Sequence, residues 1–543
     1  MKTRTTLIIS LTAIITFAAG RALAYSGGTG DPNNPYQIAT KADLLAMAAD
    51  KSYYTKCFIL TADINMGGQV FTTAIIAADT VAGNFTFDGP DFTGTFDGNG
   101  HKITGFTING GSNLWLGLFG SISSGGSVKN LGLESCSVIG YGVVGGLVGI
   151  NQSSISNCYS TGSVSGDSNS NSVGGLVGCN WGNISNCYST SSVSGGFNSQ
   201  EVGGLVGEND STISNCYSTG QVSGSNGSDS VGGLVGNSDG SIINCYSTGT
   251  VSGDSNSGSV GGLVGDNGGS ISNCYSTGTV SGGDNSMWLG GLVGANWYGS
   301  ISNCYSKGSV SGSSGSNSVG GLAGENGYSN ISNCYSTGTV TGGDNSMWLG
   351  GLVGDNDDNV SNCYSTGTVS GGSNSDAVGG LAGYNENDGN ISNCYSTGLV
   401  SGGSGSDSVG GLVGDNSDGS IVSSFWDTNT SGRSTSAGGT GKTTAQMKTK
   451  RTFTTAGWNF TTIWRMRCEG MNYPKLHWQV IPSADWVCPE GVDLADFSYL
   501  AERWHTTGCN SSNNFCGGAD MDYSGTVDME DFVMFAEEWL SGE

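Results

Sequence analysis

Short apolar runs separated by polar turns recur through the middle of the chain at a nearly constant spacing. The string Asn-Cys-Tyr-Ser occurs nine times, beside valine or isoleucine flanked by serine. A second string, Gly-Gly-Leu-(Val/Ala)-Gly, occurs ten times, with leucines 29 to 31 residues apart at positions 147, 176, 205, 234, 263, 292, 322, 352, 381 and 412. A fixed period of this length indicates a repeat architecture in which every unit adopts the same structure.

The repeating unit predicts strands, because it lacks the i, i+3, i+4 apolar spacing of a helix and its β-branched runs are bounded by Gly, Asn and Ser. One unit of about 29 residues cannot bury three short strands, whereas stacked units pair their strands at about 4.8 Å. We therefore predict a mainly β protein, a right-handed parallel β-helix (solenoid) of about ten coils. A propeller blade needs about 40 residues, so the period argues against that fold.

Stacking also predicts ladders of identical side chains. An asparagine follows Gly-Gly-Leu-x-Gly-x in nine of the ten units, and Ser238 is the exception. An inward asparagine can hydrogen-bond the coils above and below it. The repeat cysteines are expected to be small buried hydrophobes, in preference to a disulfide ladder or a metal site, because no Cys-x-x-Cys occurs. They are Cys158, Cys187, Cys216, Cys245, Cys274, Cys304, Cys334, Cys363 and Cys394.

Composition narrows the function classes. Of 543 residues, 97 are Gly and 6 are Pro, without the triplet period of collagen. The 44 acidic and 18 basic side chains give a net charge of −26, which argues against a nucleic-acid partner. The 20 Tyr and 12 Trp argue against a flexible linker. The glycines are expected at tight turns and close coil contacts.

Residues 1–24 have the pattern of a secretory signal peptide. Lys2 and Arg4 precede an apolar run, and Ala22-Leu23-Ala24 is a small-x-small cleavage site. We expect a secreted protein, extracellular or at the cell surface, with no transmembrane segment, because the apolar run is too short to span a bilayer. An uncleaved anchor is the alternative.

The chain changes character after Trp478, where helical periodicity appears. A 12-residue acidic segment carries oxygen ligands at the spacing of a calcium loop, with Gly525 at its sharp turn. Hard oxygen ligands favour Ca²⁺ over transition metals. The alternative is a solvated acidic turn. The predicted ligands are Asp520, Asp522, Ser524, the carbonyl of Thr526, Asp528 and Asp531.

The helix that follows this loop repeats one 35 residues upstream, since Phe497, Ala501 and Trp504 match Phe532, Ala536 and Trp539. A small exported module needs covalent support. We therefore expect a disulfide among Cys488, Cys509 and Cys516, with Cys468 as a candidate fourth partner.

Two family resemblances follow from these motifs. The unit resembles the GLUG repeat of bacterial exported proteins from about Leu116 to Trp426, and Phe96 to Ile103 resembles the usual first coil. This resemblance implies a right-handed β-helix, and most such proteins have no assigned activity. We divide the chain into a signal peptide (1–24), an N-terminal cap and first coils (25–115), the repeat solenoid (116–426), a closing segment (427–480) and a C-terminal module (481–543).

The duplicated loop and helix resemble a type I dockerin from about Asp485 to Leu540, which implies a cohesin-like partner for residues 481–543. Val487 and Pro489 replace two ligands of the first loop, so that loop is expected to be degenerate and empty. The positions that read a cohesin, often Ser or Thr, are Met529-Glu530 and Leu494-Ala495 here, so cohesin recognition is not implied by those residues.

Catalytic motifs are scarce. None of the three histidines begins His-Glu-x-x-His, which excludes a zincin within this chain. Positions 145–420 hold 20 acidic residues and a single basic one, Lys307, so the repeats lack the base of a polysaccharide lyase. Glu325 and Asp355 occupy the same position in adjacent coils, as a two-carboxylate hydrolase would require. Solvated acids or weak divalent-ion contacts are the preferred interpretation of this pair.

Aromatic side chains are the remaining candidates for ligand contact. Trp288 and Trp348 lie in identical inserts and are expected at loop tips, with Trp181 and Trp297 at the opposite turn. Tryptophans beside Asn and Asp can stack on sugars, although packing across coils is the alternative. We predict a non-catalytic solenoid for adhesion, glycan binding or scaffolding, with a calcium-dependent docking module. The alternatives are a dockerin-bearing polysaccharide-degrading enzyme (glycoside hydrolase or lyase) and a purely structural stalk.

Overall fold

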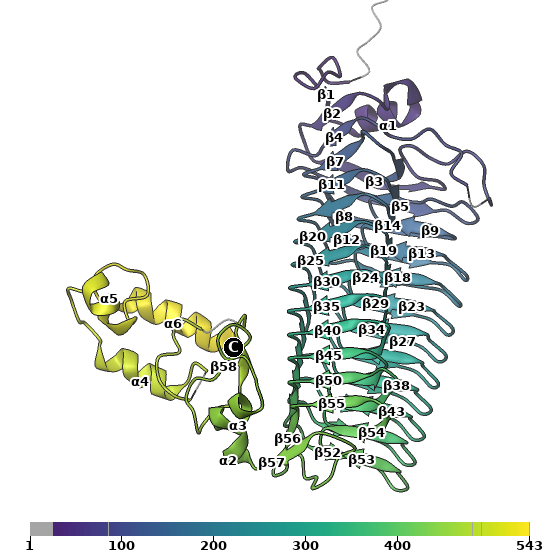
Figure 1. Cartoon of the computed structure of the whole chain (residues 1–543). Helices are drawn as coiled ribbons and strands as arrows, with labels where there is room; N and C mark the ends of the chain where they lie inside the picture. Colours follow the sequence, from purple (N-terminus) through teal and green to yellow (C-terminus); the bar gives the residue numbers. More distant parts are fainter. Residues whose placement is uncertain (1–24, 85, 480–481, 490, 542–543) are drawn as a thin grey trace, which may run out of the picture.

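The computed structural model describes residues 25–84, 86–479, 482–489 and 491–541 (Figure 1). The signal peptide expected at residues 1–24 lies outside this range. The described chain is a tall stack of β-coils, with a smaller helical module to one side of its C-terminal end. No helix in the described part is long and apolar enough to cross a membrane.

Four parallel sheets run along the stack, and we name each after the residue that marks its strands. The Ile sheet has 14 strands, from β1 (Tyr36–Ile38) to β55 (Ser420–Val422). The Asn sheet has 11, from β6 (Phe119–Ile122) to β54 (Val413–Ser417), and the Val sheet has 10, from β9 (Val143–Gly145) to β53 (Ser408–Gly410). The Tyr sheet begins with β3 (Ile64–Phe71) and includes β56 (Phe425–Asp427). The predicted parallel solenoid is confirmed, with about 11 coils.

One coil illustrates how the repeat folds. Its apolar side chains, including Val173, Leu176 and Ile184, point inward and are fully buried. A Cβ on Gly174 would lie 1.9 Å from the carbonyl oxygen of Val177, so this corner requires glycine. The strands of the coil, in chain order, are β13 (Ser172–Gly174), β14 (Val177–Asn180), β15 (Asn183–Ser185), β16 (Tyr188–Ser189) and β17 (Ser192–Ser194).

The predicted asparagine ladder is present inside the stack. Each Nδ2 donates to the Oδ1 of the next coil, for example from Asn151 to Asn180 at 2.7 Å, and the asparagines are buried except for the half-buried Asn416 at the end. At the exception, Asn209 donates to the Oγ of Ser238 at 3.0 Å. The Oδ1 of Asn267, in the following coil, is buried and has no hydrogen-bond partner. The ladder therefore has one gap, at Ser238.

The repeat cysteines form a buried column of free thiols, as expected. The backbone N–H of each donates to the Sγ of the next at 3.3–3.4 Å. At the last coil Cys394 donates instead to the Oγ of Ser424, at 3.1 Å. Serine thus replaces the thiol where the ladder ends.

Both ends of the stack are covered. Helix α1 (Lys41–Ala49) lies at the first coils and buries Leu44 and Met47 in the core. At the other end β57 (Thr440–Lys442) pairs with β56. The closing segment continues through α2 (Thr444–Met447), α3 (Lys450–Thr455) and the hairpin of β58 (Trp464–Arg465) and β59 (Lys475–Leu476). It packs Phe453, Trp458 and Trp464 on the last tyrosines of the Tyr sheet.

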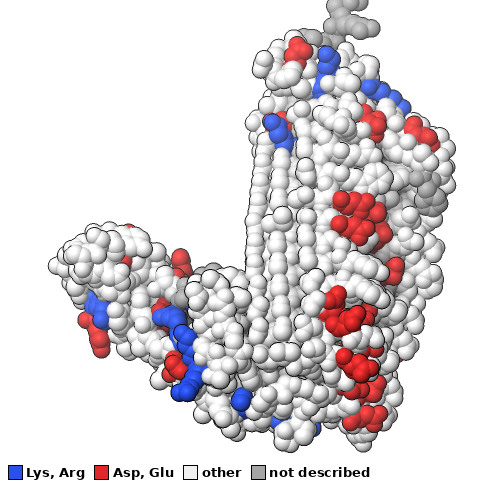
Figure 2. All heavy atoms as spheres, in the orientation of Figure 1, with Lys and Arg blue, Asp and Glu red and all other residues white. Residues whose placement is uncertain are grey.

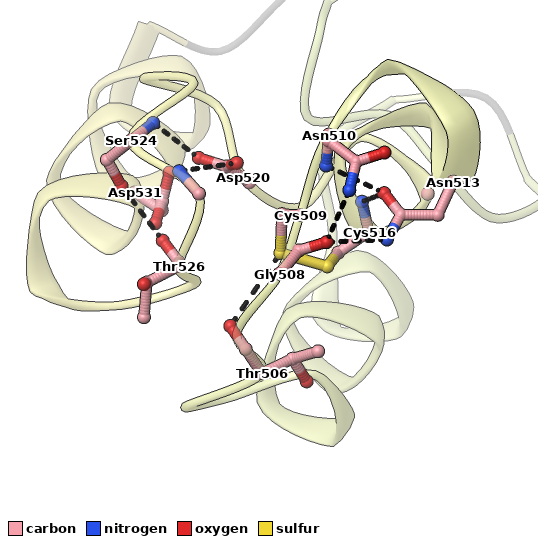
Figure 3. The surroundings of a disulfide bond; sticks show 12 residues. Thr506, Gly508, Cys509, Asn510, Asn513, Cys516, Asp520, Ser524, Thr526 and Asp531 are labelled. Atoms are coloured by element: carbon pink, nitrogen blue, oxygen red, sulfur yellow. Dashed lines mark hydrogen bonds between the residues drawn. A yellow bond between two sulfur atoms is a disulfide. The ribbon is translucent and has the colours of Figure 1, made fainter.

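The C-terminal module contains α4 (Leu494–Glu502), α5 (Asn514–Gly517) and α6 (Met529–Ser541) around a small core that includes Leu500, Val527 and Phe535. Two disulfides support it. Cys468–Cys488 links the closing segment to the module, and Cys509–Cys516 closes a loop between α4 and α6 (Figure 3).

Candidate functional site

The corner between the Val sheet and the Asn sheet carries several acidic side chains, such as Glu201 and Asp266, and aromatic side chains such as Trp348. The first residue of each Val-sheet strand lies beside the third residue of the neighbouring Asn-sheet strand, as the 3.4 Å contact of Ser172 Oγ with Cys179 Sγ shows. We call these two rows the acidic corner. Figure 2 shows acidic patches following one side of the solenoid, with the Lys and Arg seen from this side lying near the two ends and on the C-terminal part. In the first coils an apolar cluster around Trp115 covers the corner.

Burial sets the protonation of the acids at the acidic corner. It raises the pKa of Glu201 to about 7 although Ser172 Oγ donates to its carboxylate at 2.6 Å, and nearby Glu208 adds repulsion. Burial likewise raises the pKa of Asp266 to about 6. Carboxyls that lose water without gaining a cation favour the neutral form.

Glu325 and Asp355 are the most strongly perturbed pair. They are direct register partners in β39 (Ala323–Gly327) and β44 (Val353–Asn356), as their sequence positions predict. Burial, followed by repulsion from Asp357, raises the pKa of each to about 8. Glu325 is 5% exposed and Asp355 is 4% exposed, and each has one carboxylate oxygen without a hydrogen-bond partner.

A compact group of three acids includes Asp355 of this pair. Candidate ligand atoms of Asp355, Asp357 and Glu386 all lie within 4.8 Å of one another. Asp355 is the third residue of β44, and Asp357 lies in the turn that follows this strand. Glu386 is the last residue of β49 (Ala382–Glu386) in the next coil. The pKa of Asp357 is raised to about 6 by burial and by the Glu386 carboxylate. Two consecutive coils therefore contribute acids to this group.

The placement expected for two tryptophans was wrong. Trp288 and Trp348 do not sit at loop tips but begin the Val-sheet strands β33 (Trp288–Gly290) and β43 (Trp348–Gly350). The reason is register, because Trp288 pairs with Ser259 and takes the first strand position. Nor is Trp297 on an opposite turn, since its ring meets that of Trp288 edge-on at 6.1 Å.

The other aromatics divide between the acidic corner and the turns. Trp348 stacks on Tyr384 with ring centroids 5.1 Å apart and planes within 13°. Tyr298 and Tyr328 stack at 5.3 Å and are both exposed, beside Trp297. Trp181 is exposed at the turn after β14. Cross-coil packing thus accounts for the contact of Trp348 with Tyr384, and the Trp348 side chain remains half-buried.

The C-terminal acidic loop brings together three of its six expected ligands. Carboxylate oxygens of Asp520, Asp522 and Asp531 lie within 4.8 Å of one another, and Gly525 takes the left-handed conformation at φ 96°. Ser524 N–H donates to Asp520 at 3.0 Å (Figure 3). Asp528 is outside that group, because its Oδ1 accepts from Glu530 N–H at the start of α6.

The remaining two expected ligands lie close to each other in the same loop. Ser524 Oγ donates to the carbonyl of Thr526 at 3.1 Å (Figure 3). Burial raises the pKa of Asp520, whereas the Ser524 N–H lowers that of Asp522. The donor set is all oxygen, which fits a hard cation such as Ca²⁺.

The first loop, which precedes α4, has the same backbone hydrogen bonds as the second loop but a different set of charged groups at its ligand positions. Asp496 accepts from Trp486 and Val487 N–H groups at 2.6 and 2.7 Å, as Asp531 accepts from two N–H groups in the second loop. At its first position, however, Asp485 forms an ion pair with Arg467 at 2.9 Å. A guanidinium from the closing segment thus takes the place of a cation beside that carboxylate.

An aromatic ladder on the Tyr sheet was missed by sequence reasoning. Nine tyrosines from Tyr159 to Tyr395 stack with centroids 4.8–5.0 Å apart and planes within 5°. The closing segment covers its last members, where Trp478 stacks on Tyr305 and donates to the Asn333 carbonyl at 3.0 Å. The invariant tyrosine after each inward cysteine was the signal, because alternation places it on the outer face.

Comparison with known proteins agrees with the repeat. Nine segments match the family described as the GLUG motif: residues 140–165, 169–194, 198–223, 227–252, 256–281, 287–311, 315–341, 347–370 and 374–401. The solenoid of this chain is therefore built from GLUG repeats.

Two curated relatives share this part of the chain. Halomucin of Haloquadratum walsbyi is 33% identical over 170 residues, which is 30% of this chain and 2% of halomucin. A candidate Gly-rich membrane protein of Evansella cellulosilytica is 33% identical over 141 residues, 24% of this chain and 15% of that protein. The chain thus spans only a small part of these relatives. A solved structure of a candidate immunoglobulin A1 protease from Bacteroides ovatus aligns over 84% of this chain and 96% of that one, at 18% identity and a TM-score of 0.30.

Proposed function

We propose that this chain is a secreted, non-catalytic β-solenoid that binds glycans along its acidic corner, in adhesion or extracellular scaffolding. The observation that carries the proposal is the row of aromatic rings beside acids, represented by Trp348 and Tyr384 next to Asp355. Aromatic faces pack on sugar rings, and carboxylates accept hydrogen bonds from hydroxyls. Repetition along stacked coils offers a polymer several equivalent contacts.

Binding of the full chain to a glycan array and to insoluble polysaccharides tests this proposal. We expect Trp348→Ala to weaken retention, because it removes one ring of the stacked pair. Trp181→Ala is the matched control, since that ring is exposed at a turn outside the acidic corner. Equal retention of both variants and the unaltered protein, or no retention on any glycan, would contradict glycan binding and favour a structural stalk.

A polysaccharide-degrading enzyme is the second candidate, because Glu325 and Asp355 are adjacent carboxyls. A glycosidase needs one protonated and one ionised carboxyl. Here both pKa values are raised to about 8, so both groups are largely protonated at neutral pH. Because both carboxyl groups share the same protonation state, the pair favours the non-catalytic proposal. Release of reducing sugar from polysaccharides that is abolished in Glu325→Gln would overturn it.

We further assign residues 481–543 to a dockerin-like, calcium-dependent docking module for a cohesin-like protein. The duplicated hydrogen bonds of Asp496 and Asp531 support this assignment. So does an apolar groove of about 390 Å³ between α4 and α6, lined by Phe497, Leu500, Ala501, Trp504, Met529 and Phe532. Apolar grooves rimmed by polar residues are typical docking surfaces.

Calorimetry with Ca²⁺ tests the module. Asp520→Ala is expected to remove one calcium site, because it deletes a buried carboxylate of the second loop. Asp485→Ala is the control, since Arg467 already neutralises that carboxylate and no site should be lost. A calcium isotherm unchanged by Asp520→Ala would contradict the assignment, and binding of a purified cohesin only in the presence of Ca²⁺ would extend it.

A further inference from the structure

The acids at the acidic corner meet at one point of the solenoid, far along the stack from the covered first coils. Glu325 lies in β39, Asp355 in β44, and Glu386 at the end of β49, so the three strands are consecutive in the Asn sheet. Asp357 adds a fourth carboxylate from the turn after β44. Parallel stacking repeats a position every coil, and here it places the carboxyl group of Asp355 beside that of Glu325.

The spacing of the carboxylate oxygens suits one cation. Ligand atoms of Asp355, Asp357 and Glu386 lie within 4.8 Å of one another. Calcium–oxygen distances of about 2.3–2.6 Å place opposite ligands of one ion about 4.6–5.2 Å apart. Three carboxylates at this spacing are therefore compatible with a single Ca²⁺.

The buried oxygens of this group lack partners. Asp355 Oδ1 and Asp357 Oδ1 are buried without a hydrogen bond among the described residues, as is Oε2 of the neighbouring Glu325. Glu325 and Asp355 are both more than nine-tenths buried. Burying a carboxylate with no partner is unfavourable, so natural structures pair it with a cation or a proton.

Protein cations do not serve this role. Lys307 is the only basic side chain between positions 145 and 420, and its Nζ lies over the ring of Tyr305 on the Tyr sheet, a different face of the coil. The neutralising proton or cation must therefore come from solution.

We propose that Asp355, Asp357 and Glu386 form a calcium-binding site on the solenoid, separate from the C-terminal loop, with Glu325 beside it in the preceding coil. All three ligands are hard oxygen donors, which Ca²⁺ prefers. The ion would bridge two coils and remove the repulsion among their acids. The site lies next to the stacked rings of Trp348 and Tyr384, but it is argued from the carboxylates alone and does not depend on glycan binding.

The test uses the full chain carrying Asp520→Ala, so that the C-terminal loop does not contribute. After chelation, we expect calorimetry with CaCl₂ to show a remaining site and thermal unfolding to shift upward with Ca²⁺. Adding Asp357→Asn or Glu386→Gln should abolish both the heat and the shift. Asp266→Asn is the matched control. Asp266 occupies the same strand position as Asp355, but among the described residues it belongs to no group of three acids that could hold a metal ion.

Folding of the variants is checked in chelator. Removing a repelling charge should leave the circular dichroism spectrum unchanged and the melting temperature at least as high as that of the parent. Protonation alone is the competing explanation. Absence of calcium heat and of a calcium-induced shift in the Asp520→Ala chain would overturn the proposal, as would a signal that survives in the Asp357→Asn and Glu386→Gln variants. Failure of glycan retention alone would leave these readouts unaffected.

Discussion

The gap in the asparagine ladder predicts that Ser238→Asn stabilises the protein. In the present chain Ser238 Oγ accepts from Asn209, but no donor reaches Asn267 Oδ1, which is buried. Ser238 pairs in register with both Asn209 and Asn267. An asparagine at this position would accept from the coil before and donate to the coil after, as the other ladder asparagines do.

The magnitude follows from the bond that is added. A buried donor or acceptor left without a partner costs about 1–3 kcal/mol, and a neutral hydrogen bond contributes about 1 kcal/mol net. Ordering one asparagine side chain opposes this by somewhat less than about 1 kcal/mol. The net gain is therefore about 1–2 kcal/mol, which corresponds to a rise of a few °C in melting temperature at about 2–4 °C per kcal/mol.

Two measurements check this prediction. Thermal unfolding followed by circular dichroism reports the change in melting temperature. Hydrogen–deuterium exchange reports the local effect, because amides of β24 (Val235–Ser238) and β29 (Val264–Asn267) should exchange more slowly. The matched control is Asn180→Ser, which opens a second gap and should shift both readouts the other way.

Failure would be clear from the same data. If Ser238→Asn leaves exchange unchanged, or lowers the melting temperature while Asn180→Ser is neutral, then the ladder contributes no net stability. The turn after position 238 has the same length as the turn after Asn267, so poor fit would not explain that outcome.

Three further predictions concern the acids, the thiols and the closing segment. The folded protein holds the pKa of Glu201 at about 7, above the unfolded value near 4.5, so the contribution of this group to stability is present at low pH and lost as pH rises through 7. Glu201→Gln should therefore flatten the fall in melting temperature between pH 5 and pH 8. An unaltered pH profile would contradict the burial argument. A thiol reagent should label about one cysteine in the native state, Cys57, because the other free cysteines are buried. After unfolding it should label all 12 free thiols. Rapid labelling of several thiols in the native state would refute the buried cysteine column. Trp478→Ala should loosen the closing segment and speed proteolysis between residues 443 and 479, since it deletes the contacts with Tyr305 and Asn333. Unchanged digestion would show that these contacts do not hold the closing segment in place.

The solenoid could be predicted because its signal is local and repeated. The strand-forming residues recur in the same order in every coil, and a fixed period leaves few ways to stack the coils. The asparagine ladder could be predicted for the same reason, as Asn151 and Asn180 occupy one register position. Small departures were also visible in advance, since Ser238 breaks an otherwise uniform column.

The positions of the aromatics could not be predicted from the repeat alone. Ser-Met-Trp-Leu resembles a loop insert, yet Leu289 takes the place of Val260 in register, so Trp288 must begin the strand. Deciding this requires knowing which residue of the insert pairs with the coil before. The acid cluster posed a similar problem, because Asp357 lies in a turn and Glu386 ends a strand just before one, and these turns vary in length between coils.

The ladders and the acid cluster follow from one physical constraint. Parallel coils place equivalent side chains about 4.8 Å apart, whatever their chemistry. Amides such as Asn326 and Asn356 satisfy this spacing because one donates while the other accepts, at 2.8 Å. Carboxylates offer only acceptors, so Glu325 above Asp355 repels instead of bonding. A column of acids in a solenoid therefore requires protons or a cation between its members, and the place where the acids are most buried is where a cation stabilises the stack most.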